Sequence, residues 1–210
     1  LGDVYKRQGQ EHMRVAALLG RARIHGIYDT QSLSMDTAQA NFLSLQSQPL
    51  VRYNDLSSAC NDPAADALLI CTPNHTLFVV LRTAMQSNKP IFLEKPMATT
   101  LQDAAAIVRA NEAYESFIQI GLQYRFKPQY REAFREALDQ RALGEIKTVS
   151  VSEYRPPFLD KVDQWTKFEH LSGGTLVEKC CHYFDLINLM AKARPQRVYA
   201  SGGQAVNFLD

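Results

Sequence analysis

The sequence of 210 residues lacks the features that mark several classes of protein. No apolar run approaches the ~18–20 residues that a membrane-spanning helix requires. The formal net charge is only +1, which gives no electrostatic reason to expect binding to nucleic acid or to an anionic membrane. The chain does not open with the charged, apolar and small-residue segments of a signal peptide. These absences predict a cytoplasmic protein that binds neither nucleic acid nor membranes.

Cysteine is scarce, and its spacing is not that of a disulfide framework. The four cysteines are Cys60, Cys71, Cys180 and Cys181. The last two are neighbours, so on a helix their side chains would point in different directions. We therefore expect reduced thiols, which also favours the cytoplasm.

Hydrophobic residues make up 46% of the chain and charged residues 21%, an ordinary composition for a protein with a core. From about residue 22, patterns typical of strands and helices alternate. The predicted strands cover 22–29, 49–53, 66–73, 90–96 and 116–126, and the predicted helices cover 9–20, 32–46, 75–88 and 101–114. This order predicts an α/β fold with a Rossmann-type, doubly wound parallel sheet. Ligands of such sheets bind beyond the carboxyl ends of the strands.

Glycine is missing at two places where such a sheet normally has it. The sheet usually opens with a strand and a GxGxxG turn. Gly9 stands in the place of the third glycine, but Val4 and Lys6 stand in the places of the first two. Residues 1–8 also lack strand alternation, so we expect a non-native leader and a missing first strand. A natural amino-terminal arm is the alternative. The incomplete NAD-binding domain would then cover residues 9–123.

The pattern changes after residue 126. A charged helix is predicted over 127–142, a polar alternating strand over 145–155, a helix over 175–193 and a strand near 196–202, with an irregular stretch at 156–174. Alternating strands favour an open antiparallel sheet in a second, α+β domain that spans residues 124–210. These strands are too few to close a sheet, so we expect a fragment that ends within this domain.

Asp29 is the first candidate site residue. It ends a predicted strand and lies twenty positions after Gly9. At this place an acidic side chain accepts hydrogen bonds from the adenosine ribose of a dinucleotide. A carboxylate there would repel a 2′-phosphate, which favours NAD over NADP. The alternative is an aspartate that only caps the following helix.

Lys95 is the second candidate, in the sequence EKP at residues 94–96. A lysine at the carboxyl end of a strand projects into the ligand crevice, where its ammonium can hold a substrate hydroxyl and stabilise a developing alkoxide. Pro96 restricts the residue before it to extended conformations, which fixes the direction of the lysine. The alternative is a solvated lysine at a strand end.

The stretch GGTLVEKCCHYFD, residues 173–185, places Glu178 and His182 four positions apart. On one helix this spacing predicts that both side chains lie on the same face. Histidine suits the removal of a hydroxyl proton, and a neighbouring carboxylate can orient the ring. Three alternatives remain: a zinc site with Cys181, a redox pair of Cys180 with Cys181, and a purely structural helix with His182 in the core.

Taken together, several motifs resemble the Gfo/Idh/MocA oxidoreductases, the group of glucose–fructose oxidoreductase and inositol dehydrogenase. They are Gly9 with QEH, GIYD, CTPNH, EKP, GLQYRF and GGTLVEKCCHYFD, in this order. The resemblance implies an NAD(P)-binding Rossmann domain, followed by an α/β domain whose open sheet often mediates oligomers. It also implies oxidation or reduction of sugars, inositols and related polyols, and a homo-oligomer when the protein is full length.

The resemblance also implies roles for the residues that match the motifs. Thr72, Pro73, Asn74 and His75 would line the cofactor, Glu94 and Gln123 would lie near its ribose and nicotinamide, and Lys95 would contact both cofactor and substrate. The family pattern GGxLxDxGxHxxD has an Asp and a His that act with the lysine. Here Glu178 and His182 stand in those places, and Cys180 replaces the usual glycine.

The resulting expectation is an NAD-dependent dehydrogenase that acts on a secondary hydroxyl of a sugar, inositol or related polyol. Lys95, Glu178 and His182 would be its catalytic residues, with His182 as the acid–base in contact with substrate. Tyr124 and Trp165 stack on a sugar or belong to the core, and Arg125 contacts the substrate or pairs with an acid. Two rival functions are an NAD-dependent glycosidase that uses transient oxidation and a non-catalytic regulator that binds nucleotide or sugar.

Overall fold

The computed structural model describes residues 7–46, 48–154 and 162–203, and the chain forms two compact units. Unit 1 comprises Leu1–Leu122 and Tyr154–Cys181, and unit 2 comprises Gln123–Glu153 and His182–Asp210. The expected leader, residues 1–8, lies mostly outside the described residues. None of the helices in the described ranges is long and apolar enough to cross a membrane.

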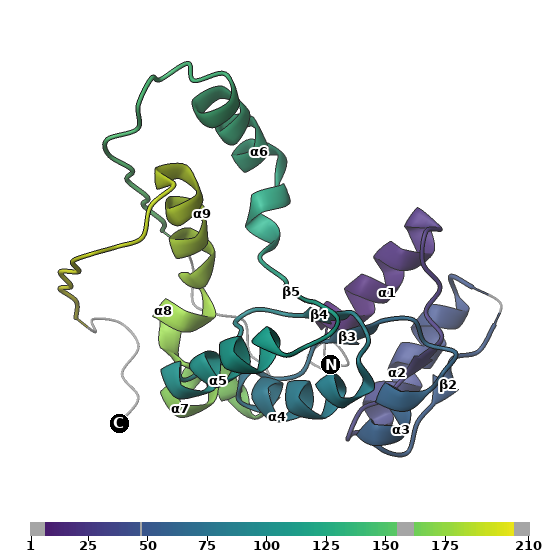
Figure 1. The fold of residues 1–210 in the computed structure, drawn as a ribbon. Helices are drawn as coiled ribbons and strands as arrows, with labels where there is room; N and C mark the ends of the chain where they lie inside the picture. The colour runs from purple at the N-terminus through teal and green to yellow at the C-terminus, as the bar shows by residue number, and fades with distance from the viewer. Residues whose placement is uncertain (1–6, 47, 155–161, 204–210) are drawn as a thin grey trace. The chain divides into compact units, whose positions relative to one another are not determined.

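Unit 1 contains parallel strands and their covering helices (Figure 1). The strands are β1 (Gly26–Ile27), β2 (Val51–Arg52), β3 (Leu68–Ile70), β4 (Ile91–Leu93) and β5 (Ile118–Ile120). β1 pairs with β2, and a second sheet has the order β3–β4–β5. In that sheet Ile91 of β4 lies between Leu68 and Ile118 in register. All pairings are parallel, which confirms the predicted α/β class.

The division into two sheets has a topological explanation. In a doubly wound sheet of order 3-2-1-4-5-6, the first strand lies between the second and the fourth. The pair β1–β2 corresponds to the 3-2 part of this order, and β3–β4–β5 corresponds to the 4-5-6 part. Among the described residues no strand precedes the first helix, so none of them forms a central strand between the two parts.

The helices of unit 1 connect the strands in the predicted alternation. They are α1 (Arg7–Leu19), α2 (Ser32–Leu43), α3 (Leu56–Asn61), α4 (Asn74–Ala84) with the 3-10 turn η2 (Met85–Ser87), and α5 (Leu101–Glu112). Two of them begin at side-chain caps: Asp55 accepts from the Ser58 amide, and Thr100 accepts from the Asp103 amide. The short helix α3 was not predicted, although Asp55 is a recognisable start signal.

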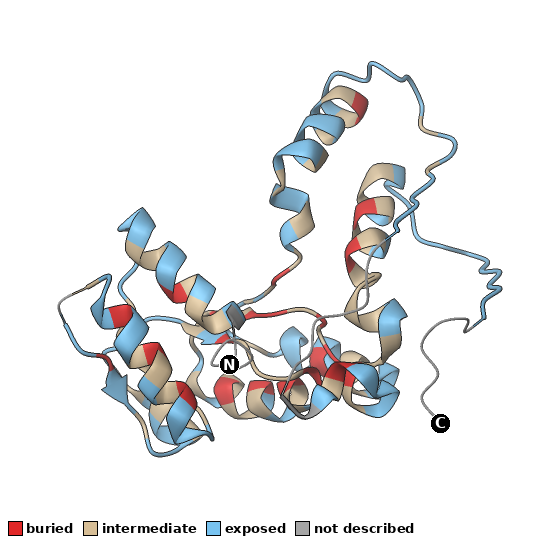
Figure 2. Ribbon diagram, turned by 180° about the vertical axis from the view of Figure 1, so that it is seen from behind, coloured by how far each residue is buried: buried red, intermediate tan, exposed pale blue. Residues whose placement is uncertain are grey.

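Two apolar clusters hold unit 1 together, and their residues are among those shown as buried in Figure 2. The larger cluster joins the β3–β4–β5 sheet to α4 and α5; it contains Cys60, Ile70, Leu77, Leu81, Ala84, Ile91, Leu93, Ala98 and Ile107. The smaller cluster joins α1, α2 and the residue before β2; it contains Met13, Ala38, Phe42 and Leu50.

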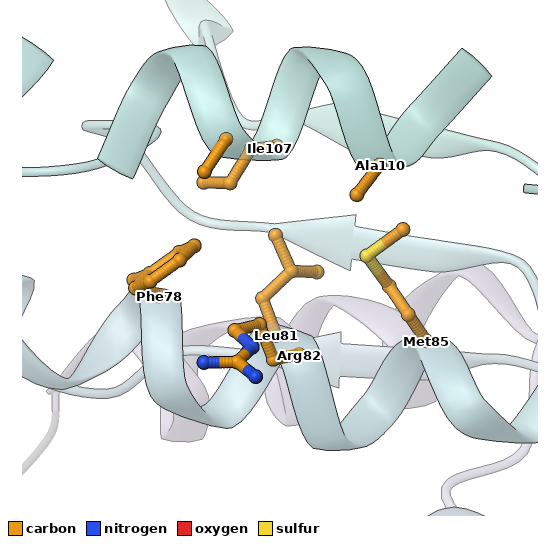
Figure 3. Close-up of a pocket in the computed structure, with 7 residues that line it drawn as sticks. Phe78, Leu81, Arg82, Met85, Ile107 and Ala110 are labelled. Atoms are coloured by element: carbon orange, nitrogen blue, oxygen red, sulfur yellow. The ribbon is translucent and has the colours of Figure 1, made fainter. Parts of the chain in front are cut away.

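A pocket of about 270 Å³ lies between α4 and α5 (Figure 3). Phe78, Leu81 and Met85 point toward Ile107 and Ala110 across it. Its lining comes from covering helices and not from strand ends. It is therefore separate from the edge of the sheet where a doubly wound fold binds its ligand.

Unit 2 differs from its prediction. The 3-10 turn η3 (Gln123–Phe126) leads into α6 (Pro128–Phe134), which continues as the π-helical turn η4 (Arg135–Asp139). The strands predicted at 145–155 and 196–202 are wrong within the described ranges, since residues 145–154 and 196–203 form no strand. A strand is defined by its paired neighbour, and the described part of unit 2 offers none. The predicted antiparallel sheet is therefore absent from that part.

The helix predicted over 175–193 is broken. Two short helices, α7 (Glu169–Ser172) and α8 (Gly174–Glu178), are followed by α9 (Cys181–Ala191). The amides of Lys179 and Cys180 both donate to the Thr175 carbonyl, which closes α8 before α9 begins. Glu178 and His182 thus lie on different helices, and the prediction that they share one helical face is wrong.

Gly173 marks the turn between α7 and α8. Its φ is +81°, a left-handed conformation that favours glycine. A Cβ at this position would lie 2.8 Å from the Val177 Cβ. Both restrictions explain why the segment that carries Glu178 begins with glycine.

Candidate active site

The carboxyl end of β4 carries a buried ion pair. Lys95 Nζ donates to Glu178 Oε1 at 2.9 Å and to the Glu178 main-chain oxygen at 2.9 Å. The two side chains are only 10% and 13% exposed. Because a buried charge without a partner is costly, this contact accounts for the presence of a lysine at the end of an apolar strand. The structure therefore brings together two of the predicted catalytic residues.

Asn74 adds a second partner for the same carboxylate. It is the first residue of α4 and is buried. Its Nδ2 donates to Glu178 Oε2 at 2.7 Å and to the Ser172 main-chain oxygen at 3.0 Å. Both carboxylate oxygens of Glu178 are thus engaged within unit 1, one by Lys95 and one by Asn74. Ser172 was not predicted as a site residue, since its contact is made through the backbone.

Glu94 is buried beside Lys95 and has different partners. His12 Nε2 lies 2.8 Å from Glu94 Oε1, and Gln8 Nε2 donates to Glu94 Oε2 at 3.4 Å. A Cβ at Gly121 would lie 3.2 Å from the Glu94 carboxyl carbon, which explains the glycine after β5. Neither partner was predicted: Gln8 falls in the expected leader, and His12 was named only as part of the motif Gly9 with QEH. The available signal was the helical spacing between Gly9 and His12.

Thr72 and Pro73 follow β3 at the same edge of the sheet. The Thr72 hydroxyl is buried and makes no hydrogen bond to any described residue. The Pro73 carbonyl accepts from both the amide and the hydroxyl of Thr76, so it serves the start of α4. A buried hydroxyl without a partner is unfavourable unless a ligand supplies one.

His75 is exposed and lies edge-on to Trp165, with ring centroids 6.4 Å apart. Desolvation lowers the pKa of His75, and the charge of His170 lowers it further. The shift favours a neutral imidazole near neutral pH. Trp165 is half-buried in the 3-10 turn η5 (Val162–Lys167) and packs on this histidine.

Asp29 and Gly9 lie close to the ends of their elements but not at the predicted boundaries. Asp29 lies two residues after β1, and its Oδ1 accepts from the Gln31 amide at 2.9 Å, which holds the turn before α2. Gly9 lies within α1, where a Cβ would make an ordinary contact of 3.9 Å with Cys71. Close approach of α1 to β3 is therefore present, but it does not by itself require glycine at this position.

The polar groups beyond two of the strands fit a dinucleotide. An acid stands beyond β1, and the orphaned hydroxyl of Thr72 stands beyond β3. The turn that would hold the pyrophosphate includes positions 4 and 6, which lie outside the described residues. Among the described residues, no group of three or more His, Cys, Asp or Glu side chains is arranged to hold a metal ion.

His182 belongs to unit 2, where it is 2% exposed. The Tyr124 ring stacks on it with centroids 4.1 Å apart and an interplanar angle of 6°. Lys127 Nζ lies 3.7 Å from the centre of the Tyr124 ring. Tyr124 thus packs on the predicted acid–base.

Arg125 and Gln123 come from the same turn as Tyr124. Arg125 Nε donates to Asp185 Oδ2 at 2.6 Å, and a second bond joins the same two side chains. The hydrogen bonds to Asp185 raise the pKa of Arg125. Of the two expectations for Arg125, the structure shows the pair with an acid. Gln123 is exposed.

Two family models match the chain. The first, described as the oxidoreductase family with an NAD-binding Rossmann fold, matches residues 4–122. The second, described as the carboxyl-terminal alpha/beta domain of the oxidoreductase family, matches residues 135–208.

Individual relatives agree with these matches. Inositol 2-dehydrogenase from Rhizobium meliloti is 27% identical over 157 residues, which are 75% of this chain and 45% of the relative. Inositol 2-dehydrogenase from Paracoccus denitrificans is 31% identical over 125 residues, 58% of this chain and 36% of the relative. The crystal structure of the WlbA dehydrogenase from Bordetella pertussis, in complex with NADH and UDP-GlcNAcA, is similar to this chain with a TM-score of 0.72 and 25% sequence identity. The match covers 88% of this chain and 56% of the WlbA chain. The chain spans about half the length of the curated relatives it matches.

Proposed function

Because the chain belongs to the Gfo/Idh/MocA oxidoreductase family, we propose that the full-length protein is an NAD-dependent dehydrogenase. Its substrate would be a secondary hydroxyl of a sugar, an inositol or a related polyol. The observation that carries this proposal is the buried pair of Lys95 and Glu178 beyond β4 of an NAD-binding Rossmann domain. The relatives named as inositol dehydrogenases support the substrate class.

Lys95 would bind and polarise the reacting hydroxyl. An ammonium has three N–H donors, and Glu178 accepts from two of them here. The third has no acceptor among the described residues and would donate to a substrate oxygen. As the hydroxyl loses its proton, the positive charge stabilises the developing alkoxide. Glu178 holds the ammonium in place where both side chains are largely shielded from water.

When bound, NAD supplies the acceptor for the hydride that leaves the substrate carbon. Asp29 would hold the adenosine ribose, and its charge would disfavour the 2′-phosphate of NADP. The buried Thr72 hydroxyl and Glu94 would contact the remainder of the cofactor. His75, Pro73 and Gln123 would line the site.

His182 would take the hydroxyl proton on its imidazole, since a base that titrates near neutral pH suits this step. Its surroundings in unit 2 support an oriented ring, because Tyr124 stacks flat on it. The carboxylate oxygens of Glu178 bond to Lys95 and Asn74. The role of Glu178 in this proposal is therefore to hold Lys95, and the stacked Tyr124 ring helps to orient the histidine.

Two further expectations remain predictions. Homo-oligomer formation by the full-length protein is expected from the family resemblance. A cytoplasmic location stays a prediction from the spacing of the cysteines in the sequence.

The test is a measurement of net NADH formation by the full-length protein with a panel of inositols and sugars. Lys95→Met should lower kcat by at least about 10²-fold, because it removes the charge that stabilises the alkoxide. Lys147→Met is the matched control, since Lys147 also pairs with a glutamate, Glu145, but is 73% exposed. Unchanged turnover in Lys95→Met, or loss of activity in both variants alike, would contradict the assignment. Substrate turnover without net NADH would favour transient oxidation.

A further inference from the structure

We propose that Asn74 is a positioning residue of this site: its amide fixes the Glu178 carboxylate in the orientation in which that carboxylate holds Lys95. The effect on turnover rests on the proposed function, whereas the effect on the lysine does not. The resemblance assigned Asn74 to the cofactor, so the inference gives this residue a different task.

The hydrogen bonds of Asn74 carry the argument. A side-chain amide has two N–H donors, and the contacts to Ser172 O and Glu178 Oε2 account for both. The amide nitrogen therefore has no donor left for a dinucleotide, and only Oδ1 remains for such a contact. Thr72, two residues earlier, has the buried hydroxyl that lacks a partner among the described residues. Ligand binding and positioning are thus divided between neighbouring residues of one loop.

The acceptor that anchors Asn74 is itself held in place. Ser172 is 1% exposed. Its hydroxyl donates to the Phe168 carbonyl at 2.9 Å and accepts from the Gly174 amide at 3.0 Å. The adjacent Gly173 requires a left-handed backbone, so the direction of the Ser172 carbonyl is fixed locally. Asn74 consequently connects the carboxylate of Glu178 to the backbone of the α7–α8 turn through its two hydrogen bonds.

The chemistry also requires an amide at this position. An aspartate could not donate to either acceptor, and its carboxylate would lie about where Nδ2 now lies, 2.7 Å from Glu178 Oε2. Two carboxylates this close do not both stay ionised, so they would share a proton or move apart. In either case Glu178 would hold Lys95 less well.

The experiment uses Asn74→Asp and Asn74→Leu in the full-length protein. Asn74→Leu removes both donors at similar size and without a new charge. Asn88→Asp is the matched control, because Asn88 also donates to a glutamate, Glu115, but both of these residues are exposed. Folding of every variant is checked by circular dichroism.

Kinetics gives the first readout. Both Asn74 variants should lower kcat by about 10–100-fold, the loss typical of a misplaced catalytic group, while KM for NAD changes less than about twofold. Asn74→Asp should also move the acid limb of the pH–rate profile to higher pH by about one unit, because the paired carboxylates retain a proton. Asn88→Asp should have the same kcat, KM for NAD and pH–rate profile as the parent protein.

The second readout needs no activity. The ¹⁵N NMR signal of the Lys95 ammonium, identified by its loss in Lys95→Met, should broaden or shift in both Asn74 variants and stay unchanged in Asn88→Asp. The proposal is overturned if the variants keep the parent signal, kcat and pH profile and lose only stability. It is also overturned if KM for NAD rises while kcat stays, which is the signature of a cofactor contact. If the parent oxidises no polyol, the proposed function fails, and the ammonium signal still decides the positioning role.

Discussion

Replacing Glu178 with glutamine tests the buried ion pair on which the proposed chemistry depends. The substitution keeps the size and most of the hydrogen-bonding shape of the side chain, but it removes a negative charge 2.9 Å from Lys95 Nζ. At an effective dielectric constant of about 20, the Coulomb attraction at this distance is roughly 6 kcal/mol. Desolvation of the two groups already offsets part of it, so loss of one partner from a buried pair typically costs about 3–5 kcal/mol.

A second estimate gives an upper limit for the free-energy cost of leaving Lys95 without its partner. Lysine can avoid a buried, unpaired charge by releasing its proton, and for an ordinary lysine at pH 7 this costs about 4–5 kcal/mol. The penalty cannot exceed that value by much. We therefore expect Glu178→Gln to lower the free energy of unfolding by about 3–5 kcal/mol, measured by urea denaturation of the full-length protein with unit 1 followed separately by hydrogen exchange.

Controls separate the ion pair from a general loss of packing. Glu145→Gln removes the glutamate of an exposed Lys–Glu pair and should change stability by less than about 0.5 kcal/mol. Adding Lys95→Met to Glu178→Gln should recover much of the loss, because no charge is then left buried without a partner. Equal stability of Glu178→Gln and Glu145→Gln, or a double variant no better than the single one, would refute the reasoning.

Three other predictions concern separate residues. His182→Ala should slow alcohol oxidation by roughly 10²–10⁴-fold in steady-state kinetics with little change in NAD affinity, and near-parental turnover would contradict its acid–base role. Asp29→Ala should reduce the ratio of kcat/KM for NAD to that for NADP, and a parent protein that prefers NADP would contradict the role of Asp29. The hydrogen bond from Tyr53, followed by one from the Ala64 amide, lowers the pKa of Asp62 to about 2. Because the pKa of Asp62 in the folded state lies below its ordinary value near 3.9, ionised Asp62 stabilises the fold above pH 4. Asp62→Asn should therefore lower Tm above pH 4, and the difference in Tm should disappear as the pH falls toward 2. A difference in Tm that does not depend on pH would contradict this prediction.

The alternation of strands and helices was predictable because most elements of unit 1 contribute apolar residues to the two clusters. At β3 a run of apolar residues indicated a strand covered on both sides, and the structure pairs it in parallel with β4 but leaves Leu69 45% exposed. The observed strands are shorter than predicted, since a ladder of hydrogen bonds extends only as far as both partners run together. At β1 the predicted strand 22–29 is reduced to Gly26–Ile27, which is paired on one side only within the part of the chain that the structure describes.

The errors have a common origin in contacts that local patterns do not contain. The break between α8 and α9 depends on how the amides of Lys179 and Cys180 close on Thr175, although the spacing of Glu178 and His182 fits a continuous helix. The polar alternation of residues 145–155 indicated a strand, but alternation only shows that a segment suits a sheet with a partner. The predicted site residues were recognisable as chemical groups at strand ends, whereas their hydrogen-bond partners were not.

Glu94 and Glu178 show how the fold gives two similar groups different tasks. Both carboxylates lie next to Lys95, one as its neighbour in the chain and one as its ion-pair partner 83 positions away. Glu94 is bonded by His12 and Gln8 from α1, which precede it by more than 80 residues, whereas Glu178 faces a cation and an amide. Carboxylates in different surroundings can carry out different steps at one pH. In unit 1 Glu178 balances the charge of Lys95. Glu94 contacts α1, and a dinucleotide would approach the start of α1.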